Sequence, residues 1–233
     1  MTSRVLLIAY AVVSVANVAS EAAGSTWFTT TTKACLMPLL LAWLLVQMRT
    51  DHNHPLALRW LAVGVLFAWF GDLLLSGDGD GFFIAGIAAF LVMQVCYIIA
   101  FTRVPGPGLV RAWKIALVPY VLLWLILNVL LSPGVGALRI PVLLYSVVLV
   151  AMAVAALDLV IRVPEDKGWR VAIGAGLFVL SDALIALTAF GPLSESRWWS
   201  VVIMATYLTA QAMIVTGLVH ALATEPHRVT ATR

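Results

Sequence analysis

The sequence predicts an all-α polytopic membrane protein with eight transmembrane helices, and three observations support this fold class. Of the 233 residues, 63% are hydrophobic and 11% are charged, whereas a soluble domain has about 25% charged residues. The apolar stretches are continuous, and most approach the ~20 residues that a helix needs to cross hydrocarbon. They do not alternate between polar and apolar residues, as the strands of a membrane barrel do. We therefore predict a single integral membrane domain over residues 1–233.

The eight spans follow one another along the chain with short loops between them. Their predicted ranges are 5–20, 30–48, 57–76, 82–102, 111–131, 139–161, 170–190 and 198–222. The first begins after a basic residue and ends in small residues, a pattern that a signal peptide shares. We predict that it is retained as a helix, because a count of eight agrees with the distribution of charge.

The basic residues gather in alternate loops and so predict the orientation. Eleven Lys and Arg residues fall on the side of the two termini and three on the other. By the positive-inside rule both termini are cytoplasmic, and we expect residence in a bacterial cytoplasmic membrane. Topology also accounts for the net charge of +3, so no nucleic-acid partner is predicted. The three residues on the opposite side are Lys33, Arg139 and Arg197.

Three aspartates lie inside predicted spans. Asp158 precedes Arg162 by four residues at a cytoplasmic helix end, which favours an interfacial ion pair. Asp72 lies 13 residues beyond Arg59, and Asp182 lies 12 residues beyond Arg170. At the rise of an α-helix these carboxylates are ~20 Å and ~18 Å from the cytoplasmic edge. Both therefore reach one level, past the midplane of the bilayer.

The sequences around these two aspartates resemble each other and predict an internal repeat. "GVLFAWFGDLLLS" and "AGLFVLSDALIAL" share a Leu-Phe pair, a small residue before Asp, and an aliphatic run after it. The next spans correspond loosely, with Gln94 and Tyr97 in one and Tyr207 and Gln211 in the other. A 4+4 duplication into parallel halves would bring the two Asp-bearing helices together around a central axis.

A buried charge costs about 2.5–3.5 kcal/mol even on a lenient insertion scale, so two at one depth call for an explanation. One alternative is structural, with neutral carboxyls that hydrogen-bond neighbouring helices. The functional alternative is that burial and mutual repulsion keep one carboxyl protonated as an acid and leave its partner ionised as a base.

Other polar residues can join such a site. Lys33 lies ~24 Å from the cytoplasmic edge; it either snorkels to the outer interface or balances an aspartate or a lipid phosphate. Arg139 is either an interfacial cation or a substrate-binding or supporting residue. Asn17 either faces the pocket or packs helices together.

Metal and serine hydrolase chemistry have no motif in this chain. His52 and His54 lie in the loop "RTDHNHP", where histidines are usually solvated, and neither HExxH nor GxSxG occurs. We predict no metal and no cofactor.

Several segments together resemble the YhhN-like lysoplasmalogenase family. They are "TTKACLMPLLLAWLL", "LFAWFGDLLLS", "FFIAGIAAFLVMQVCYIIAF", "LFVLSDALIAL" and "ATYLTAQAMIV". The resemblance implies a membrane hydrolase that cleaves the vinyl ether bond of a lysoplasmalogen, a lysophospholipid drawn from the membrane, into a fatty aldehyde and a glycerophospho-ethanolamine or -choline.

The resemblance also implies which residues act. The family aspartates fall on Asp72 and Asp182. The supporting positions are Lys33, Tyr145, Tyr207 and Gln211. The chain departs from the family pattern at Ala34, where proline is usual, and at Gln94, where histidine is frequent. A proton-coupled transporter with the same carboxylate pair is the alternative function.

Overall fold

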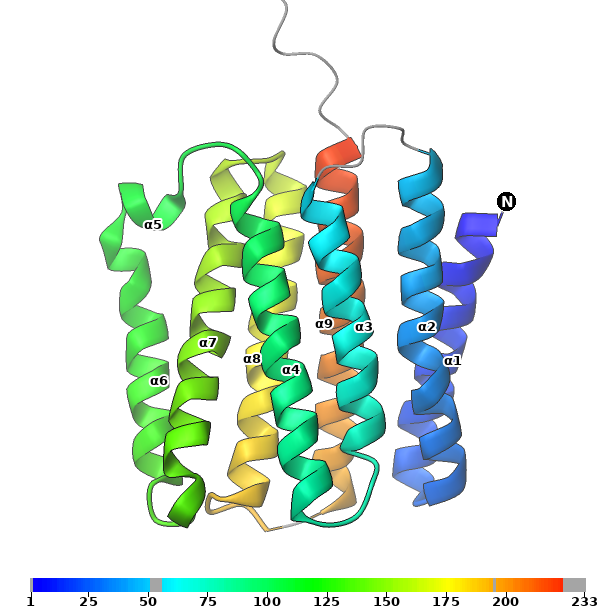
Figure 1. The fold of residues 1–233 in the computed structure, drawn as a ribbon, viewed down its shortest axis with the longest axis vertical. Coiled ribbons are helices and arrows are strands. Elements are labelled where there is room, and N and C mark those ends of the chain that lie inside the picture. Colours follow the sequence, from blue (N-terminus) through cyan, green and yellow to red (C-terminus); the bar gives the residue numbers. More distant parts are fainter. Residues whose placement is uncertain (1, 51–55, 195, 224–233) are drawn as a thin grey trace, which may run out of the picture.

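The computed structural model describes residues 2–50, 56–194 and 196–223, with the backbone alone for Thr2, Thr50, Arg111 and Ala112. Within these residues it confirms the all-helical fold, with eight helices long and apolar enough to cross a membrane (Figure 1). The long helices are α1 (Thr2–Ala23), α2 (Thr26–Thr50), α3 (Leu56–Leu74), α4 (Asp80–Thr102), α6 (Val118–Leu131), α7 (Arg139–Leu157), α8 (Glu165–Ala189) and α9 (Arg197–Ala223). The short ones are α5 (Leu109–Ala112), η1 (Lys114–Leu117), η2 (Gly136–Leu138) and η3 (Asp158–Ile161).

The fifth predicted span, 111–131, differs from the structure at its start. It is divided into the end of α5, the 3₁₀ turn η1 and the helix α6. The break falls at Trp113, whose backbone angles of φ −134° and ψ 80° are not helical. Pro119 follows in the first turn of α6, where its missing N–H leaves no hydrogen bond unmade.

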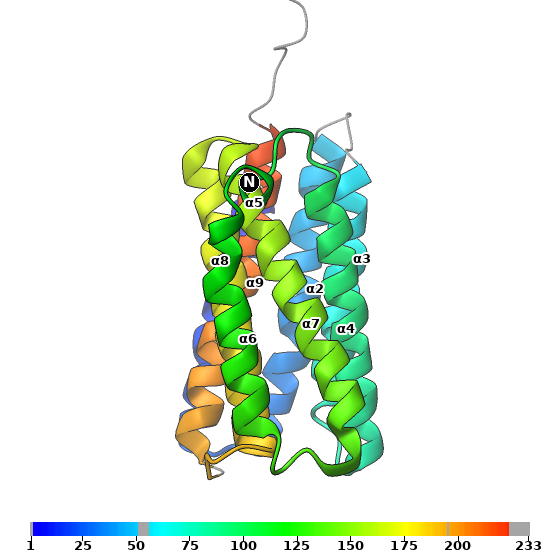
Figure 2. The same cartoon turned by 90° about the vertical axis from the view of Figure 1, so that its left-hand side faces the viewer.

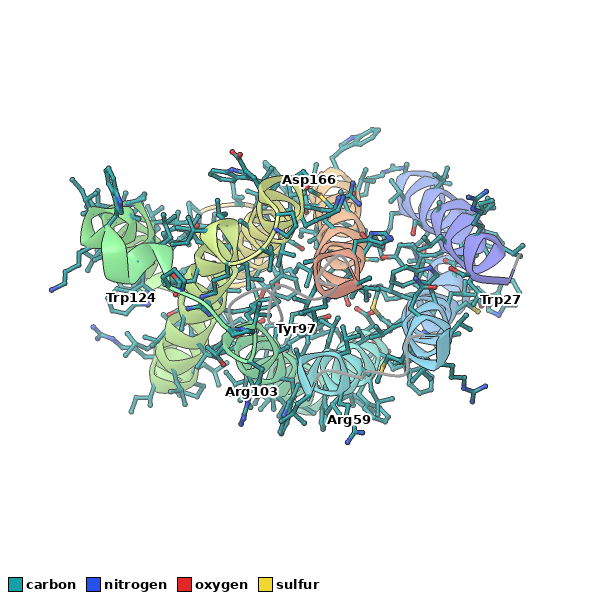
Figure 3. All side chains as sticks on the ribbon, turned by 90° about the horizontal axis from the view of Figure 1, so that it is seen from above. Trp27, Arg59, Tyr97, Arg103, Trp124 and Asp166 are labelled. Carbon is teal, nitrogen blue, oxygen red and sulfur yellow. The ribbon has the colours of Figure 1, made fainter. Side chains whose placement is uncertain are left out.

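The helices form a central group of four flanked by two pairs. Seen from above, α3, α4, α8 and α9 occupy the middle, with α1 and α2 on one side and α6 and α7 on the other (Figure 3). Figure 2 views the molecule from the side of α6 and α7. In the central group α3 packs along α4 and α8 along α9. The helices α3 and α8 lie diagonally across it, so the Asp-bearing helices share this group without packing directly against each other.

Glycines set the close approach within the central pairs. A Cβ added to Gly64 of α3 would lie 2.4 Å from the ring of Tyr97 in α4, and one added to Gly71 would lie 2.7 Å from the ring of Phe90. On α8, a Cβ at Gly174 would lie 2.9 Å from Met213 of α9. The absence of a side chain therefore lets aromatic rings and backbones approach where the polar residues of the spans are found.

The ion pair predicted between Asp158 and Arg162 is confirmed, with 3.2 Å between Oδ2 and Nη2. The other carboxylate oxygen of Asp158 accepts the backbone N–H of Val110 at 2.8 Å, and Arg162 Nε donates to the carbonyl of Pro107 at 3.2 Å. A Cβ at Gly108 would lie 2.6 Å from Asp158 Oδ2. This cluster fastens the α4–α5 connection to the end of α7.

Most of the described basic residues gather at one end of the bundle, and Lys33, Arg139 and Arg197 lie toward the other. That end holds the start of α1 and the ends of α2, α4 and α9 (Figure 1), and Arg59 and Arg103 project from its rim (Figure 3). The charge asymmetry counted along the sequence is therefore present in space, while the orientation in a bilayer stays a prediction.

Candidate active site

Asp182 is held by side chains from two other helices. It lies in α8 and is 9% exposed. The hydroxyl of Tyr145, from α7, donates to Asp182 Oδ2, and the amide Nε2 of Gln94, from α4, lies 3.4 Å from the same oxygen. Gln94 itself is fully buried, and its Oε1 accepts no hydrogen bond from the described residues. An amide thus contacts Asp182 where the family pattern often has a histidine.

Asp72 has a separate set of partners. It lies near the end of α3, 4% exposed, and the hydroxyl of Tyr207 from α9 donates to its Oδ2 at 2.9 Å. Lys33 of α2 is the positive charge that acts on this carboxyl. Of the residues predicted as supporting, Tyr207 therefore contacts Asp72 directly, and Lys33 acts on it through its charge without forming an ion pair among the described residues.

A proline on α2 helps to join Lys33 and Asp72. Pro38 lies inside α2 and has no N–H to donate to the carbonyl four residues earlier, at Ala34. The indole of Trp69 in α3 donates to that carbonyl at 2.9 Å instead. Trp69 precedes Asp72 by three residues, so this bond fastens α2 to α3 next to the aspartate.

The remaining predicted pair, Tyr97 and Gln211, lies in the interior of the bundle. Tyr97 donates to Gln211 Oε1 at 2.6 Å, and Figure 3 shows Tyr97 in the middle of the central group. Gln211 Nε2 lies 3.4 Å from the sulfur of Met93. Both residues are fully buried, so this pair links α4 to α9 inside the bundle.

Tyr10 is a buried polar residue that is not among the predicted site residues. Its hydroxyl donates to the carbonyl of Leu208 at 2.8 Å, which attaches α1 to α9 one residue beyond Tyr207. The sequence carried one signal for it, since a tyrosine interrupts the apolar run "VLLIAYAVV" in the first span.

Aromatic rings separate the two aspartate clusters. The ring centroid of Tyr207 lies 5.9 Å from that of Phe90 and 6.0 Å from that of Phe178. Each aspartate accepts a hydrogen bond from a residue in the other half of the chain. Asp72 of α3 accepts from Tyr207 of α9, and Asp182 of α8 accepts from Gln94 of α4. These crossed bonds are compatible with the predicted 4+4 repeat, which stays a prediction.

A groove of about 330 Å³ lies against the Asp182 cluster. Its walls are apolar except at Tyr145 and Asp182, and they come from α4, η2, α7 and α8 together with Leu75 and Phe190. The wall residues Ile84, Ile140 and Leu144 are exposed at the molecular surface. The groove therefore opens on the flank of the bundle, at a depth where a bilayer would surround it.

Two predicted residues lie apart from both clusters. Asn17 donates to the Thr32 hydroxyl at 2.8 Å and to the Thr29 carbonyl at 3.1 Å, so it packs α1 against α2. Arg139 is the first residue of α7, between the groove-lining residues Leu138 and Ile140. It therefore lies at the outer end of the groove.

Within the described ranges, no three His, Cys, Asp or Glu side chains gather as a metal site would require. His52 and His54 lie outside the residues that the structure describes.

Comparisons with known proteins show the family of this chain. The chain is 32% identical to lysoplasmalogenase TMEM86A of Bos taurus over 72% of its own length and 68% of that protein. It is also 32% identical to lysoplasmalogenase TMEM86A of Homo sapiens, over 71% of this chain and 67% of that one. No solved structure matches it. The profile of the YhhN family matches residues 28–218, a range that contains both aspartate clusters and the groove, and the chain belongs to the YhhN family.

Proposed function

We propose that this protein is a lysoplasmalogenase-type ether hydrolase that works within the membrane. The observation that carries the proposal is the apolar groove, which ends on a carboxyl and a hydroxyl in a chain related to lysoplasmalogenases. Such a groove suits the alkenyl chain of a lysolipid, because its walls offer hydrocarbon and its inner end offers polar groups.

Vinyl ether hydrolysis needs a proton on the alkene carbon, which leaves an oxocarbenium-like cation. Water then adds to that cation, and the hemiacetal collapses to an aldehyde and an alcohol. Asp182 is the carboxyl that lines the groove, so it is the proposed proton donor. The Tyr145 hydroxyl bonded to it holds the carboxyl in place.

Asp72 is the proposed ionised partner. It lies behind the groove wall, because Phe90 lines the groove and packs against Tyr207, the hydrogen-bond partner of Asp72. In a medium of low dielectric, the negative charge of Asp72 behind this aromatic wall stabilises the developing cation electrostatically. When no substrate is bound, the positive charge of Lys33 compensates the negative charge of Asp72.

Arg139 is the proposed contact for the lipid phosphate. It precedes Tyr145 by six residues on α7 and so lies ~9 Å from it along the helix axis. A phosphate held there leaves the glycerol and the first atoms of its ether-linked chain to reach Asp182. The rest of the chain can leave through the open flank of the groove. The transporter alternative shares the two carboxylates, and the relatives found here do not support it.

The first prediction concerns the two aspartates. Asp72→Asn and Asp182→Asn should each abolish aldehyde release from lysoplasmalogen, because an amide cannot deliver the proton or supply the negative charge. Asparagine keeps an oxygen that can accept the tyrosine hydroxyl, so both variants should still insert and fold. Mass spectrometry of purified protein on a panel of lysolipids measures the release.

The panel also separates this substrate from related ones. Release from an ester- or alkyl-linked lysolipid, with none from the vinyl ether, would move the proposal to another lipid hydrolase. Full activity of both variants would overturn the carboxylate mechanism. Asp166→Asn, at an exposed carboxylate in the first turn of α8, is the matched control and should leave the rate unchanged.

A further inference from the structure

The two carboxyl oxygens of Asp182 have different surroundings. Oδ2 accepts the hydroxyl of Tyr145 from α7, and it lies 3.4 Å from the amide Nε2 of Gln94 from α4. Oδ1 accepts no hydrogen bond from the described residues, since both bonds to this carboxyl end on Oδ2. The protein therefore supplies two donors to one oxygen and none to the other.

The oxygen without a donor is also the accessible one. Within the described ranges, buried polar side-chain atoms without a partner occur at Asn17, Trp43 and Gln94. Oδ1 of Asp182 has no partner either, yet it is not among these buried atoms. An oxygen with neither a partner nor complete burial lies at the edge of open volume, and Asp182 is a residue that lines the groove.

The two donors also favour one position for the proton of a neutral Asp182. A carboxylic acid has one oxygen that carries the proton and one carbonyl oxygen that only accepts. The Tyr145 hydroxyl and the Gln94 amide are donors at Oδ2, which makes Oδ2 the carbonyl oxygen. The proton then belongs on Oδ1.

We propose that Tyr145 and Gln94 fix the reactive proton of Asp182 on Oδ1, the oxygen that meets a bound lipid, and that Gln94 is a positioning residue of this site. The inference rests on the proposed function, in which Asp182 is the neutral acid. No Lys, Arg or His among the described residues forms an ion pair with Asp182. The two neutral donors therefore determine which oxygen keeps the proton.

The same bonds serve the carboxyl after it has reacted. Proton transfer breaks the Oδ1–H bond and forms a C–H bond at the alkene carbon farther from the ether oxygen. The carboxylate that remains keeps both donors on Oδ2, and hydrogen bonds to a charged acceptor are stronger than those to a neutral one. The water that adds to the cation gives one proton to Oδ1. The hemiacetal then passes its hydroxyl proton to the glycerol oxygen as their C–O bond breaks, so Asp182 ends as it began.

Substitutions at Gln94 test this assignment in the purified protein. Gln94→Met removes the N–H donor from an unbranched side chain, whereas Gln94→His keeps an N–H donor. Gln94→Met should lower kcat about tenfold or more, as the loss of a hydrogen bond to a charged group does. KM should change little, because Gln94 does not line the groove, and Gln94→His should recover most of the lost kcat. Gln47→Met on α2, the same exchange outside the site, is the matched control and should keep the wild-type kcat.

Infrared difference spectra give a readout that does not need turnover. Each protein is compared with its own Asp182→Asn counterpart, which isolates the carboxyl band of Asp182. A carbonyl that loses a hydrogen bond absorbs at a higher wavenumber, so the band should move up in Gln94→Met and return toward the wild-type position in Gln94→His. With the proton on Oδ2 instead, the carbonyl oxygen would be Oδ1 and Gln94→Met would leave the band in place. An unmoved band, or no band of a protonated carboxyl, overturns the proposal.

The two measurements separate this inference from the proposed function. A band that moves as expected in a protein that releases no aldehyde would remove the proposed function and leave the proton on Oδ1. A wild-type kcat in Gln94→Met, or an equal loss of kcat in Gln47→Met, would show that Gln94 does not position the acid.

Discussion

At the level of single residues, the two aspartates can be compared by their hydrogen-bond partners and by their access to the groove. Asp72 and Asp182 both accept a tyrosine hydroxyl, and Asp182 also lines the groove. An intramembrane carboxyl with a bonded partner and access to a ligand is a functional-site candidate by default. The residue at its side, Tyr145, can therefore be tested apart from the carboxyl itself.

We expect Tyr145→Phe to lower kcat by about 10- to 100-fold, since a hydrogen bond to a charged group contributes about 1.5–3 kcal/mol. KM should change little, because the ring that lines the groove is kept. Steady-state kinetics on mixed micelles measure both constants. Tyr120→Phe, on α6, removes a hydroxyl away from the groove; an equal loss in that control would assign the effect to general packing.

The sequence singled out most of the buried polar residues that the structure brings together, but not their grouping; their roles stay predictions. The intramembrane charges and amides stand out in an apolar chain, which is why Asp72, Asp182, Gln94 and Gln211 could be predicted. Partners depend on helix packing, which a repeat pattern does not supply. The aromatic layer at Phe90 could not be predicted either, because a phenylalanine in an apolar span carries no distinguishing signal.

At the scale of helices, small residues determine which elements can carry the site. The α8–α9 pair brings Asp182 and Tyr207 into the central group, and Gly174 and Gly217 lie at its interface. The predicted spans gave the order and lengths of these helices. The break at Trp113 was missed although Arg111 and Lys114 flank it, because the predicted span was begun at Arg111 and the continuous apolar run starts only at Ile115.

Gly174 and Gly176 offer a matched pair on α8. Alanine gains about 0.5–1 kcal/mol over glycine in a helix, and at Gly176 no atom lies within 4 Å of the added Cβ. At Gly174 that Cβ would lie 2.9 Å from Met213 and 3.1 Å from the Ala210 carbonyl, and overpacking costs about 1–3 kcal/mol. Thermal unfolding in detergent should show Gly174→Ala below and Gly176→Ala above the wild type; the same direction for both would contradict this packing.

The whole molecule has an end rich in basic residues and an end that carries the site. The eight helices place the start of α1 and the end of α9 at the basic end (Figure 1). At the other end α7 begins with Arg139 and α8 ends (Figure 1), and residues near both of these helix termini line the groove. If the basic end is cytoplasmic, the groove receives lipid from the outer leaflet.

Cysteine labelling tests this orientation in a variant that lacks Cys35 and Cys96. A membrane-impermeant maleimide should label Ser194→Cys in intact cells, because this position follows α8 at the end that carries the site. Asp166→Cys, at the basic end of the same helix, should react only after permeabilisation. The reverse pattern would invert the predicted topology.

The lateral opening of the groove also determines which substrate concentration governs the rate of this enzyme. A lipid that arrives from the side is counted by its mole fraction in the membrane, and its bulk molarity has no direct bearing on the rate. Diluting it with inert lipid or detergent at constant amount should slow turnover, as in surface-dilution kinetics. In the proposed reaction the two products would then separate by phase, with the aldehyde staying in the bilayer and the glycerophospho headgroup leaving for water.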